Sequence, residues 1–236
     1  MRDVNIDYDL LIGVDETGVG DYFTPVISVS CFIPKTNLEL VKELGVKDSK
    51  LLKENKIIEL ASKLKTLVKW KSLTLSQAGY NKLISAKINN NEIKTLIHSK
   101  TINNLLKVLD QKVDVLVDQY TISRQVYENH LIKLQSIKWL DFQKPNATIY
   151  LTTKAESKSL AVASASIIAR SILLEKIKAQ REQYNFNFSL GASKKIISEG
   201  LEFAKKFGLE ELKKVSKFSF KITKEIIDIL DEDKLF

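Results

Sequence analysis

The sequence LLIGVDETGVGDYF, residues 10–23, predicts where the sheet of this protein begins. It opens with a short apolar run, and such a run bounded by polar and glycine residues is typical of a buried strand. We expect this strand to span residues 10–14 and to end at Asp15, with a turn over residues 17–21 and a second strand over residues 25–33. Together these segments predict an opening β-hairpin.

Hydrophobic periodicity divides the rest of the chain into helices and strands. No Pro/Gly/Ser-rich linker, repeat or low-complexity tract interrupts it. The sequence therefore predicts an α/β fold, a mixed β-sheet flanked by helices, in one domain over residues 1–236 with a helical C-terminal part at about 194–236. Further strands are expected at residues 69–75, 113–117 and 148–152, and helices at residues 50–68, 77–86, 92–109, 123–134, 157–180 and from 194 onward.

The predicted helix over residues 157–180 is apolar nearly all round in its first half, so we expect it to be buried. Ala161, Ala165 and Ala169 lie four apart on one of its faces. Because these side chains are small, the backbone of the helix should be able to approach a sheet closely.

The composition indicates a basic protein that resides in a reducing compartment. Lysine and arginine outnumber aspartate and glutamate by 37 to 29, and the formal net charge of +8 suits either a polyanionic partner or an ordinary basic protein. The single cysteine, Cys31, excludes a disulfide framework. No stretch has the character of a signal peptide or a membrane span, so we expect a cytoplasmic protein that does not bind a membrane.

Four acids stand at the ends of predicted apolar strands: Asp15, Glu16, Asp118 and Glu156. A single acid at such a place is more often a loop or helix-cap residue than a ligand. Four of them point to a metal site, because the ends of neighbouring strands converge and clustered carboxylates repel one another unless cations lie among them. These oxygen ligands favour Mg²⁺ or Mn²⁺ over zinc.

Asp15 and Glu16 pose a geometric problem, because consecutive residues of a regular strand point to opposite faces. We therefore expect the strand to end at this pair. Gly18, Val19 and Gly20 follow at once, and a hairpin turn is the ordinary explanation of that pattern. Beside an acidic cluster, the glycines would also let backbone amides approach a sugar-phosphate chain.

Six segments follow one another along the chain: GVDETGVGDYF (13–23), KDSK (47–50), YN (80–81), VDQY (117–120), KAES (154–157) and LAVASASIIAR (160–170). In this order they resemble the successive motifs of ribonuclease HIII. The resemblance implies a ribonuclease H-like fold and a metal-dependent endonuclease that hydrolyses the RNA strand of RNA/DNA hybrids to 5′-phosphate and 3′-hydroxyl ends. It also implies two Mg²⁺ or Mn²⁺ ions during catalysis; we expect no small-molecule cofactor and a monomer.

The resemblance also implies roles for single residues. The metal ligands fall on Asp15, Glu16, Asp118 and Glu156, and a glutamate at the fourth place is similar to type HIII, whereas the sister type HII usually has aspartate there. Some residues are implied as contacts to the hybrid, but each has an ordinary alternative: the lysines can be solvated surface side chains, and Tyr80 and Asn81 can simply begin a helix. The implied contacts to the hybrid are Gly18, Val19, Gly20, Lys47, Ser49, Lys50, Tyr80, Asn81 and Lys154.

Three other functions stay open: a type HII-like enzyme that cuts at single ribonucleotides in duplex DNA, a catalytically inactive hybrid-binding module, and a DNA-cutting relative of the same fold. Glu156 together with Asp21, Tyr22 and Phe23 argues against the first. The presence of all four acids argues against the second, and the motifs argue against the third. We expect His98 and His130 at the surface or partly packed, and Trp70 and Trp139 in the core or at its rim.

The chain departs from the family pattern in four places. Members usually carry an N-terminal substrate-binding domain shaped like the TATA-binding protein, but only nine residues precede the first predicted strand. We therefore expect binding to rest on phosphate contacts from lysines and to weaken with salt. Thr24 replaces a usual glycine, Val19 fills a place often taken by Thr, Lys or Arg, and Ser219 stands where a His-Phe pair is common.

Overall fold

A computed structural model describes residues 7–46 and 52–232 of the chain. The chain divides into two compact units, neither of which is a continuous stretch of sequence. The prediction of one domain stays a prediction, and each unit is described by itself below. The first unit draws on Met1–Glu16, Ile27–Leu73 and Asn91–Ser171, and the second on Thr17–Val26, Thr74–Asn90 and Ile172–Phe236.

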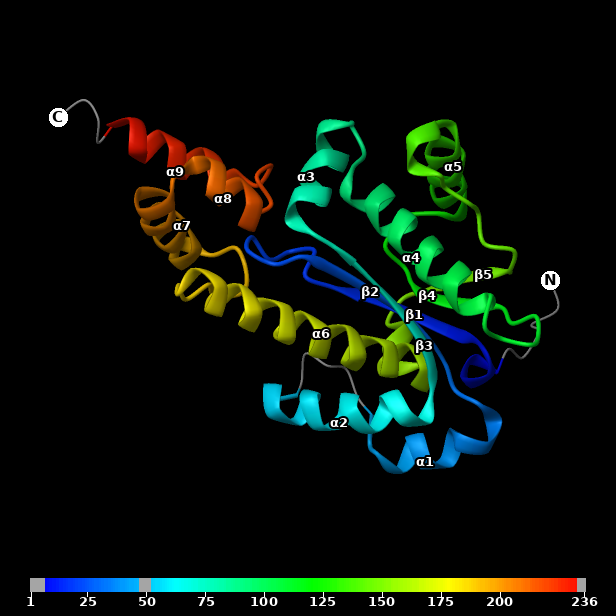
Figure 1. Cartoon of the computed structure of the whole chain (residues 1–236). Helices are drawn as coiled ribbons and strands as arrows, with labels where there is room; N and C mark the ends of the chain where they lie inside the picture. The colour runs from blue at the N-terminus through cyan, green and yellow to red at the C-terminus, as the bar shows by residue number, and fades with distance from the viewer. Residues whose placement is uncertain (1–6, 47–51, 233–236) are drawn as a thin grey trace. The chain divides into compact units, whose positions relative to one another are not determined.

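The first unit is built on a five-stranded sheet with the strand order β3-β2-β1-β4-β5 (Figure 1). Strand β4 lies between β1 and β5 and pairs in parallel with both. Every predicted strand overlaps an observed one, and the predicted mixed sheet flanked by helices is confirmed. The strands are β1 (Ile12–Thr17), β2 (Val26–Phe32), β3 (Lys69–Leu75), β4 (Val115–Asp118) and β5 (Ile149–Thr152).

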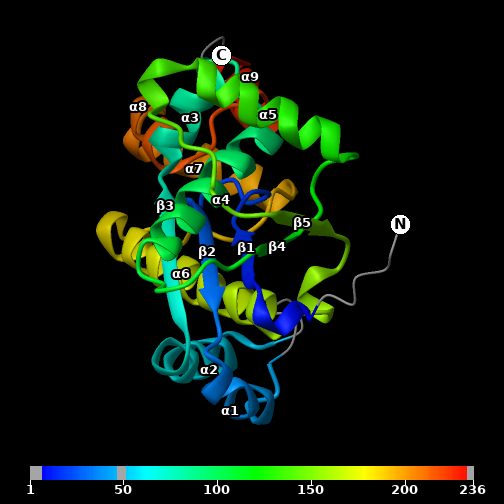
Figure 2. The same ribbon diagram turned by 90° about the vertical axis from the view of Figure 1, so that its right-hand side faces the viewer.

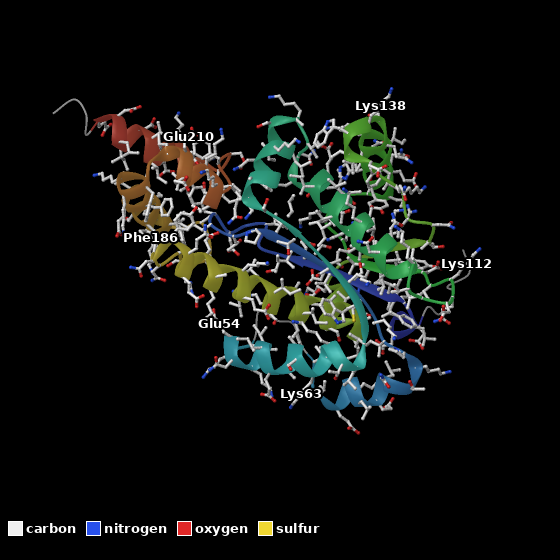
Figure 3. The ribbon with its side chains drawn as sticks, in the orientation of Figure 1. Glu54, Lys63, Lys112, Lys138, Phe186 and Glu210 are labelled. Carbon is white, nitrogen blue, oxygen red and sulfur yellow. The ribbon has the colours of Figure 1, made fainter. Side chains whose placement is uncertain are left out.

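Helices cover both faces of this sheet (Figures 1 and 2). On one face lie α4 (Asn90–Leu106) and α5 (Arg124–Ser136). On the other lie α2 (Glu54–Leu67), whose outer side carries the exposed Lys63 (Figure 3), and the first part of α6 (Leu160–Tyr184). The sequence did not predict α1 (Leu38–Glu43), because a six-residue helix is too short to show a clear period.

The α4 face is joined to the sheet by buried hydroxyls. Ser28 and Ser30, which share one face of β2, both bond the Thr101 hydroxyl of α4, at 3.2 and 2.9 Å. All seven residues of β2 are buried, and this includes Cys31, whose thiol pKa is raised by burial. A strand buried on both faces explains why this segment is almost continuously apolar.

On the opposite face, α6 packs directly against β1 at Gly13. A Cβ atom on Gly13 would lie 2.2 Å from the Val162 nitrogen and 2.3 Å from the Ala161 carbonyl carbon, both of which are backbone atoms of α6. Ala161 and Ala165 are fully buried. The predicted close approach of this helix to the sheet is therefore confirmed.

The predicted end of the first strand is wrong. β1 does not stop at Asp15 but continues through Glu16 to Thr17. A strand that ended at this pair would let both acids reach one site from one face. The structure instead keeps the strand regular, so that Asp15 and Glu16 point to opposite faces of the sheet.

The second unit is helical and has an aromatic core. Ring centroids of Phe188 lie 5.0 Å from those of both Phe23 and Phe186, and 5.3 Å from that of Phe203. Phe186 is buried, whereas Glu210 on α8 is exposed (Figure 3). The helices of this unit are α3 (Gln77–Ser85), the rest of α6, α7 (Lys194–Phe207), α8 (Leu209–Val215) and α9 (Lys221–Glu232).

The contact between α6 and β1 makes Gly13 sensitive to substitution. Gly13→Ala should lower the free energy of unfolding by about 3 kcal/mol, because the added methyl meets backbone atoms that cannot rotate away. Gly20→Ala is the matched control, since nothing lies within 4 Å of its Cβ position, and it should cost less than about 0.5 kcal/mol. Urea denaturation of both variants checks this. Equal stability of the two would contradict the backbone contact.

Candidate active site

Asp15 and Asp118 extend from neighbouring strands at the same level of the sheet. Each directly follows a member of the pair Val14 and Val117, which are opposite one another in the parallel pairing of β1 and β4. Equivalent positions on paired strands share a face. That face is the α6 side, because Asp15 is hydrogen bonded to Ser166 of α6. The two carboxylates are close enough for Asp118 to disfavour ionisation of Asp15.

Glu16 projects to the other face and is held there by α4. Its Oε1 atom is 2.7 Å from Lys94 Nζ, and its Oε2 atom is 2.9 Å from His98 Nε2. The Glu16 side chain is 12% exposed and His98 is 4% exposed, so little water reaches this contact. Glu16 therefore has a cationic or polar partner on each oxygen.

Tyr120 supports this group of side chains from the loop after β4. Its ring packs edge-on against His98, with 5.4 Å between ring centroids, and Lys94 Nζ lies 5.5 Å from its centre. The Tyr120 hydroxyl is 2.8 Å from Thr95 Oγ1, which also lies 3.1 Å from His130 Nδ1. The prediction that both histidines lie at the surface or only partly packed is wrong, because each is buried and uses a ring nitrogen in this network.

The two adjacent acids differ in electrostatic environment. Burial, the neighbouring Glu16 charge and Asp118 together raise the pKa of Asp15, although hydrogen bonds from Ser166 and the Glu16 backbone oppose them. Burial also acts to raise the pKa of Glu16, but His98 and Lys94 outweigh it and the net shift is downward. The carboxylate charge of Glu16 is thus compensated by protein groups, whereas that of Asp15 is not.

Glu156 reaches the same edge of the sheet through a short 3-10 helix, η5 (Ala155–Ser157), that follows β5. The Ala155 N–H donates to Asp118 Oδ1 at 3.0 Å, which places η5 against the end of β4. Lys154 precedes it in the left-handed conformation, with φ of 55°, and its side chain is exposed. Glu156 therefore directly follows Ala155, the residue whose N–H binds Asp118.

The four acids do not form a closed metal cage. Within residues 7–46 and 52–232, no three His, Cys, Asp or Glu side chains are arranged so that they could hold a metal ion. The donor chemistry nevertheless fits a hard divalent cation, because Asp15 and Asp118 place two carboxylates side by side and, in the described part of the chain, no cationic side chain pairs with Asp15. Mg²⁺ commonly keeps several waters and binds through one or two carboxylates plus substrate phosphate, so a closed cage is not required.

The remaining predicted contacts lie in different parts of the chain. Gly18, Val19 and Gly20 form the turn after β1 and belong to the second unit, as do Tyr80 and Asn81 on α3. Tyr80 is buried and donates its hydroxyl to Asn90 Oδ1 at 2.6 Å. Lys47, Ser49 and Lys50 lie outside the described residues. As hybrid contacts, all of these stay predictions.

Asn81 ties two parts of the second unit together. Its side-chain amide donates to the carbonyls of Lys213 and Ser216, and its Oδ1 atom accepts the Phe218 N–H at 2.9 Å. These bonds occupy both ends of the side chain. A structural role is thus present for Asn81 whether or not the hybrid also contacts it.

Sequence reasoning missed Lys94 and His98 as members of the site. They are four apart, so they share one face of α4, and this spacing was a usable signal. It was not decisive, because nothing in the sequence states that this face of α4 meets the end of β1.

Comparison with known proteins assigns the chain to a family. A family model described as Ribonuclease HII matches residues 12–223. Ribonuclease HIII of Bacillus mycoides (strain KBAB4) is 35% identical over 222 residues, which cover 93% of this chain and 69% of that protein. Ribonuclease HIII of Bacillus anthracis is 34% identical over 222 residues, which again cover 93% of this chain and 69% of that protein.

Solved structures give the same result. Bst-RNase HIII in complex with Mn²⁺ is 26% identical, with a TM-score of 0.86 over 94% of this chain and 71% of that chain. RNase H3 of Aquifex aeolicus is 27% identical, with a TM-score of 0.70 over 90% of this chain and 73% of that chain. The architecture is thus a ribonuclease H-like fold. This chain belongs to the ribonuclease HII family and, within it, to the ribonuclease HIII type.

Because protein groups stabilise the charge of Glu16 but not that of Asp15, neutralising these two acids should change the free energy of unfolding in opposite directions. Without metal, Asp15→Asn should raise the free energy of unfolding by about 1 kcal/mol, because it removes a carboxylate that is buried beside Glu16 and Asp118. Glu16→Gln should lower it by about 2 kcal/mol, because Lys94 and His98 lose their charged partner.

Urea denaturation in EDTA measures both effects. Asp110→Asn, which changes an exposed acid of the same unit, is the control and should leave stability within about 0.5 kcal/mol. Changes of the same sign in Asp15→Asn and Glu16→Gln would contradict the assigned environments.

Proposed function

We propose that this chain is a metal-dependent endonuclease that hydrolyses the RNA strand of RNA/DNA hybrids and leaves 5′-phosphate and 3′-hydroxyl ends. Its family membership and the naming of its relatives support the class of enzyme. The observation that carries the proposal is the pair Asp15 and Asp118, two carboxylates in register on adjacent parallel strands. The Mn²⁺ complex of a similar protein supports Mg²⁺ or Mn²⁺ as the cofactor.

The predicted metal ligands are Asp15, Glu16, Asp118 and Glu156, of which Glu16 points to the face of the sheet opposite Asp15. When bound, divalent ions would lower the pKa of a water molecule and offset the charge that develops on the leaving 3′-oxygen. Asp15 and Asp118 would supply the first carboxylate oxygens, since they already share a face of the sheet. Glu156 would join from η5, next to the backbone group that orients Asp118.

Lys94 and His98 are positioning residues in this proposal. They keep Glu16 ionised and fix its carboxylate on the α4 side. The exposed ammonium of Lys154, two residues before Glu156, is suited to meet a phosphate of the hybrid. Gly18, Val19 and Gly20 would offer backbone amides to the sugar-phosphate chain, because glycine lets a ligand come close to the backbone.

A second candidate function is cleavage at single ribonucleotides in duplex DNA, since the matching family model is described as Ribonuclease HII. Glu156, in place of the aspartate usual in type HII, favours the hybrid as the substrate. Parallel assays on an RNA/DNA hybrid and on duplex DNA with one ribonucleotide separate the two. Preference for the second substrate would overturn our choice.

Loss of any one of the four acids should abolish most of the cleavage. Asp15→Asn, Glu16→Gln, Asp118→Asn and Glu156→Gln should each reduce kcat on a hybrid by about 100-fold or more, because each removes a metal-binding charge. Glu54→Gln on α2, where the glutamate is exposed, should keep wild-type turnover (Figure 3). Near-normal kcat in any of the four would show that the residue is wrongly assigned.

Ca²⁺ should support hybrid binding with little cleavage. Its larger and more flexible coordination shell can accept phosphate oxygens without imposing the in-line geometry that hydrolysis needs. Fluorescence anisotropy with Ca²⁺ should give a saturable binding curve, while gel assays of the same samples show uncut RNA. Robust turnover with Ca²⁺ would contradict a strict geometric requirement at the metal site.

A further inference from the structure

A lysine is buried in the second unit, and among residues 7–46 and 52–232 its ammonium is hydrogen bonded only to carbonyl and hydroxyl oxygens of one turn. Lys217, in the segment between α8 and α9, is 0% exposed. Its ammonium donates to the carbonyls of Gly18 at 2.8 Å and Asp21 at 2.6 Å, and to that of Thr24. All three carbonyls belong to the turn that joins β1 to β2. One side chain therefore fixes three points of that turn.

Burying an ammonium costs free energy of hydration, so packing alone does not explain a lysine at this position. Burial lowers the pKa of Lys217 to about 7, and only Asp21 opposes the shift. No ion pair to Lys217 occurs within the described part of the chain; instead, its ammonium lies 5.7 Å from the ring centre of Tyr80 and 5.9 Å from that of Phe220. Three carbonyl acceptors need three N–H donors, which an ammonium has and a neutral amine lacks. A methionine could fill the same space without this cost.

The carbonyl contacts determine where the amides of the turn point. In a trans peptide, the C=O of one residue and the N–H of the next point in opposite directions. Since the Gly18 carbonyl is directed at Lys217, the Val19 N–H is directed away from it. Within residues 7–46 and 52–232, neither the Val19 nor the Gly20 N–H has a hydrogen-bond acceptor. Both amides are therefore available to a ligand.

One backbone bond of the turn also meets that peptide, since the Asp21 N–H donates to the Gly18 carbonyl at 3.3 Å. Other bonds hold the turn without meeting it. The Lys217 N–H donates to the Tyr22 carbonyl at 2.8 Å, and the Tyr22 N–H donates to the Gly191 carbonyl at 2.9 Å. The Gly191 N–H in turn donates to Asp21 Oδ1 at 2.8 Å. These bonds order the later part of the turn. Among the described side chains, Lys217 and Thr24 alone bond the Gly18 carbonyl.

We propose that Lys217 is a positioning residue for substrate binding: by holding the Gly18 carbonyl, it presents the Val19 amide to the sugar-phosphate chain of the hybrid. The inference rests on the proposed function, in which this turn contacts the substrate. It adds a residue that none of the recognised motifs contains. Its role is indirect, because Lys217 is buried and does not itself meet the hybrid.

The test compares Lys217→Met with Thr223→Val in the full chain. Lys217→Met removes the three side-chain donors and keeps a long apolar side chain. Thr223→Val removes a buried bond of 2.8 Å between Thr223 Oγ1 and the Tyr22 hydroxyl, in the same unit, and leaves the Gly18 carbonyl untouched. Steady-state cleavage of a hybrid with Mg²⁺ gives kcat and KM, and anisotropy with Ca²⁺ gives Kd.

We expect Lys217→Met to raise KM and Kd about tenfold while kcat changes less than about twofold, because binding is lost but the metal site is not. Thr223→Val should leave KM within about twofold of wild type, whatever its effect on stability. Equal KM values for the two variants would overturn the inference and leave Lys217 as a structural residue. Absence of hybrid cleavage by the wild type would instead overturn the proposed function.

Lys217→Arg keeps the test decisive if Lys217→Met does not fold, as judged by circular dichroism. A guanidinium retains the charge and the donors, but its planar fork cannot meet three carbonyls gathered around one nitrogen. KM should therefore still rise several-fold with kcat preserved. A KM equal to that of the wild type would contradict the need for a lysine at this position.

Discussion

The alternation of side chains along β1 is the constraint on which the site depends. Gly13 and Asp15 face α6, and Val14 and Glu16 face α4, because successive residues of a strand point to opposite sides. The absence of a side chain at Gly13 lets α6 pack at backbone contact, and Ser166 of that helix then reaches Asp15. Close packing and a polar contact thus arise from one face of one strand.

This alternation gives the two adjacent acids different chemistry. Glu16 enters a buried environment where α4 supplies Lys94 and His98, and its charge is stabilised before any metal binds. Asp15 enters an environment that contains Asp118 and a serine, and its charge is disfavoured. A divalent cation would relieve the repulsion at Asp15, whereas at Glu16 there is little repulsion to relieve. In the proposed enzyme, the two residues are therefore not interchangeable, although they are neighbours in the sequence.

The second unit contributes through backbone rather than side-chain chemistry. Its aromatic core, centred on Phe188, holds together segments that are far apart in the chain. In the same unit, Lys217 donates hydrogen bonds to carbonyls of the turn after β1 and so orients its peptide groups. Burying an ammonium without a carboxylate partner is unfavourable, so the three carbonyls must be gathered tightly around it to offset the loss of hydration.

The sequence by itself determined the order of the five strands and of the longer helices up to α6 along the chain, the approach of α6 to the sheet and the four acids as candidates. Those features depend on local periodicity, on small residues at fixed spacing and on acids at strand ends, all of which are visible in one dimension. Only the tertiary structure decided that β1 continues past Asp15, that His98 is buried against Glu16, and that Lys217 reaches Gly18. These contacts join residues 82 and 199 positions apart. No local pattern encodes such pairs, because they exist only once helices and turns have packed.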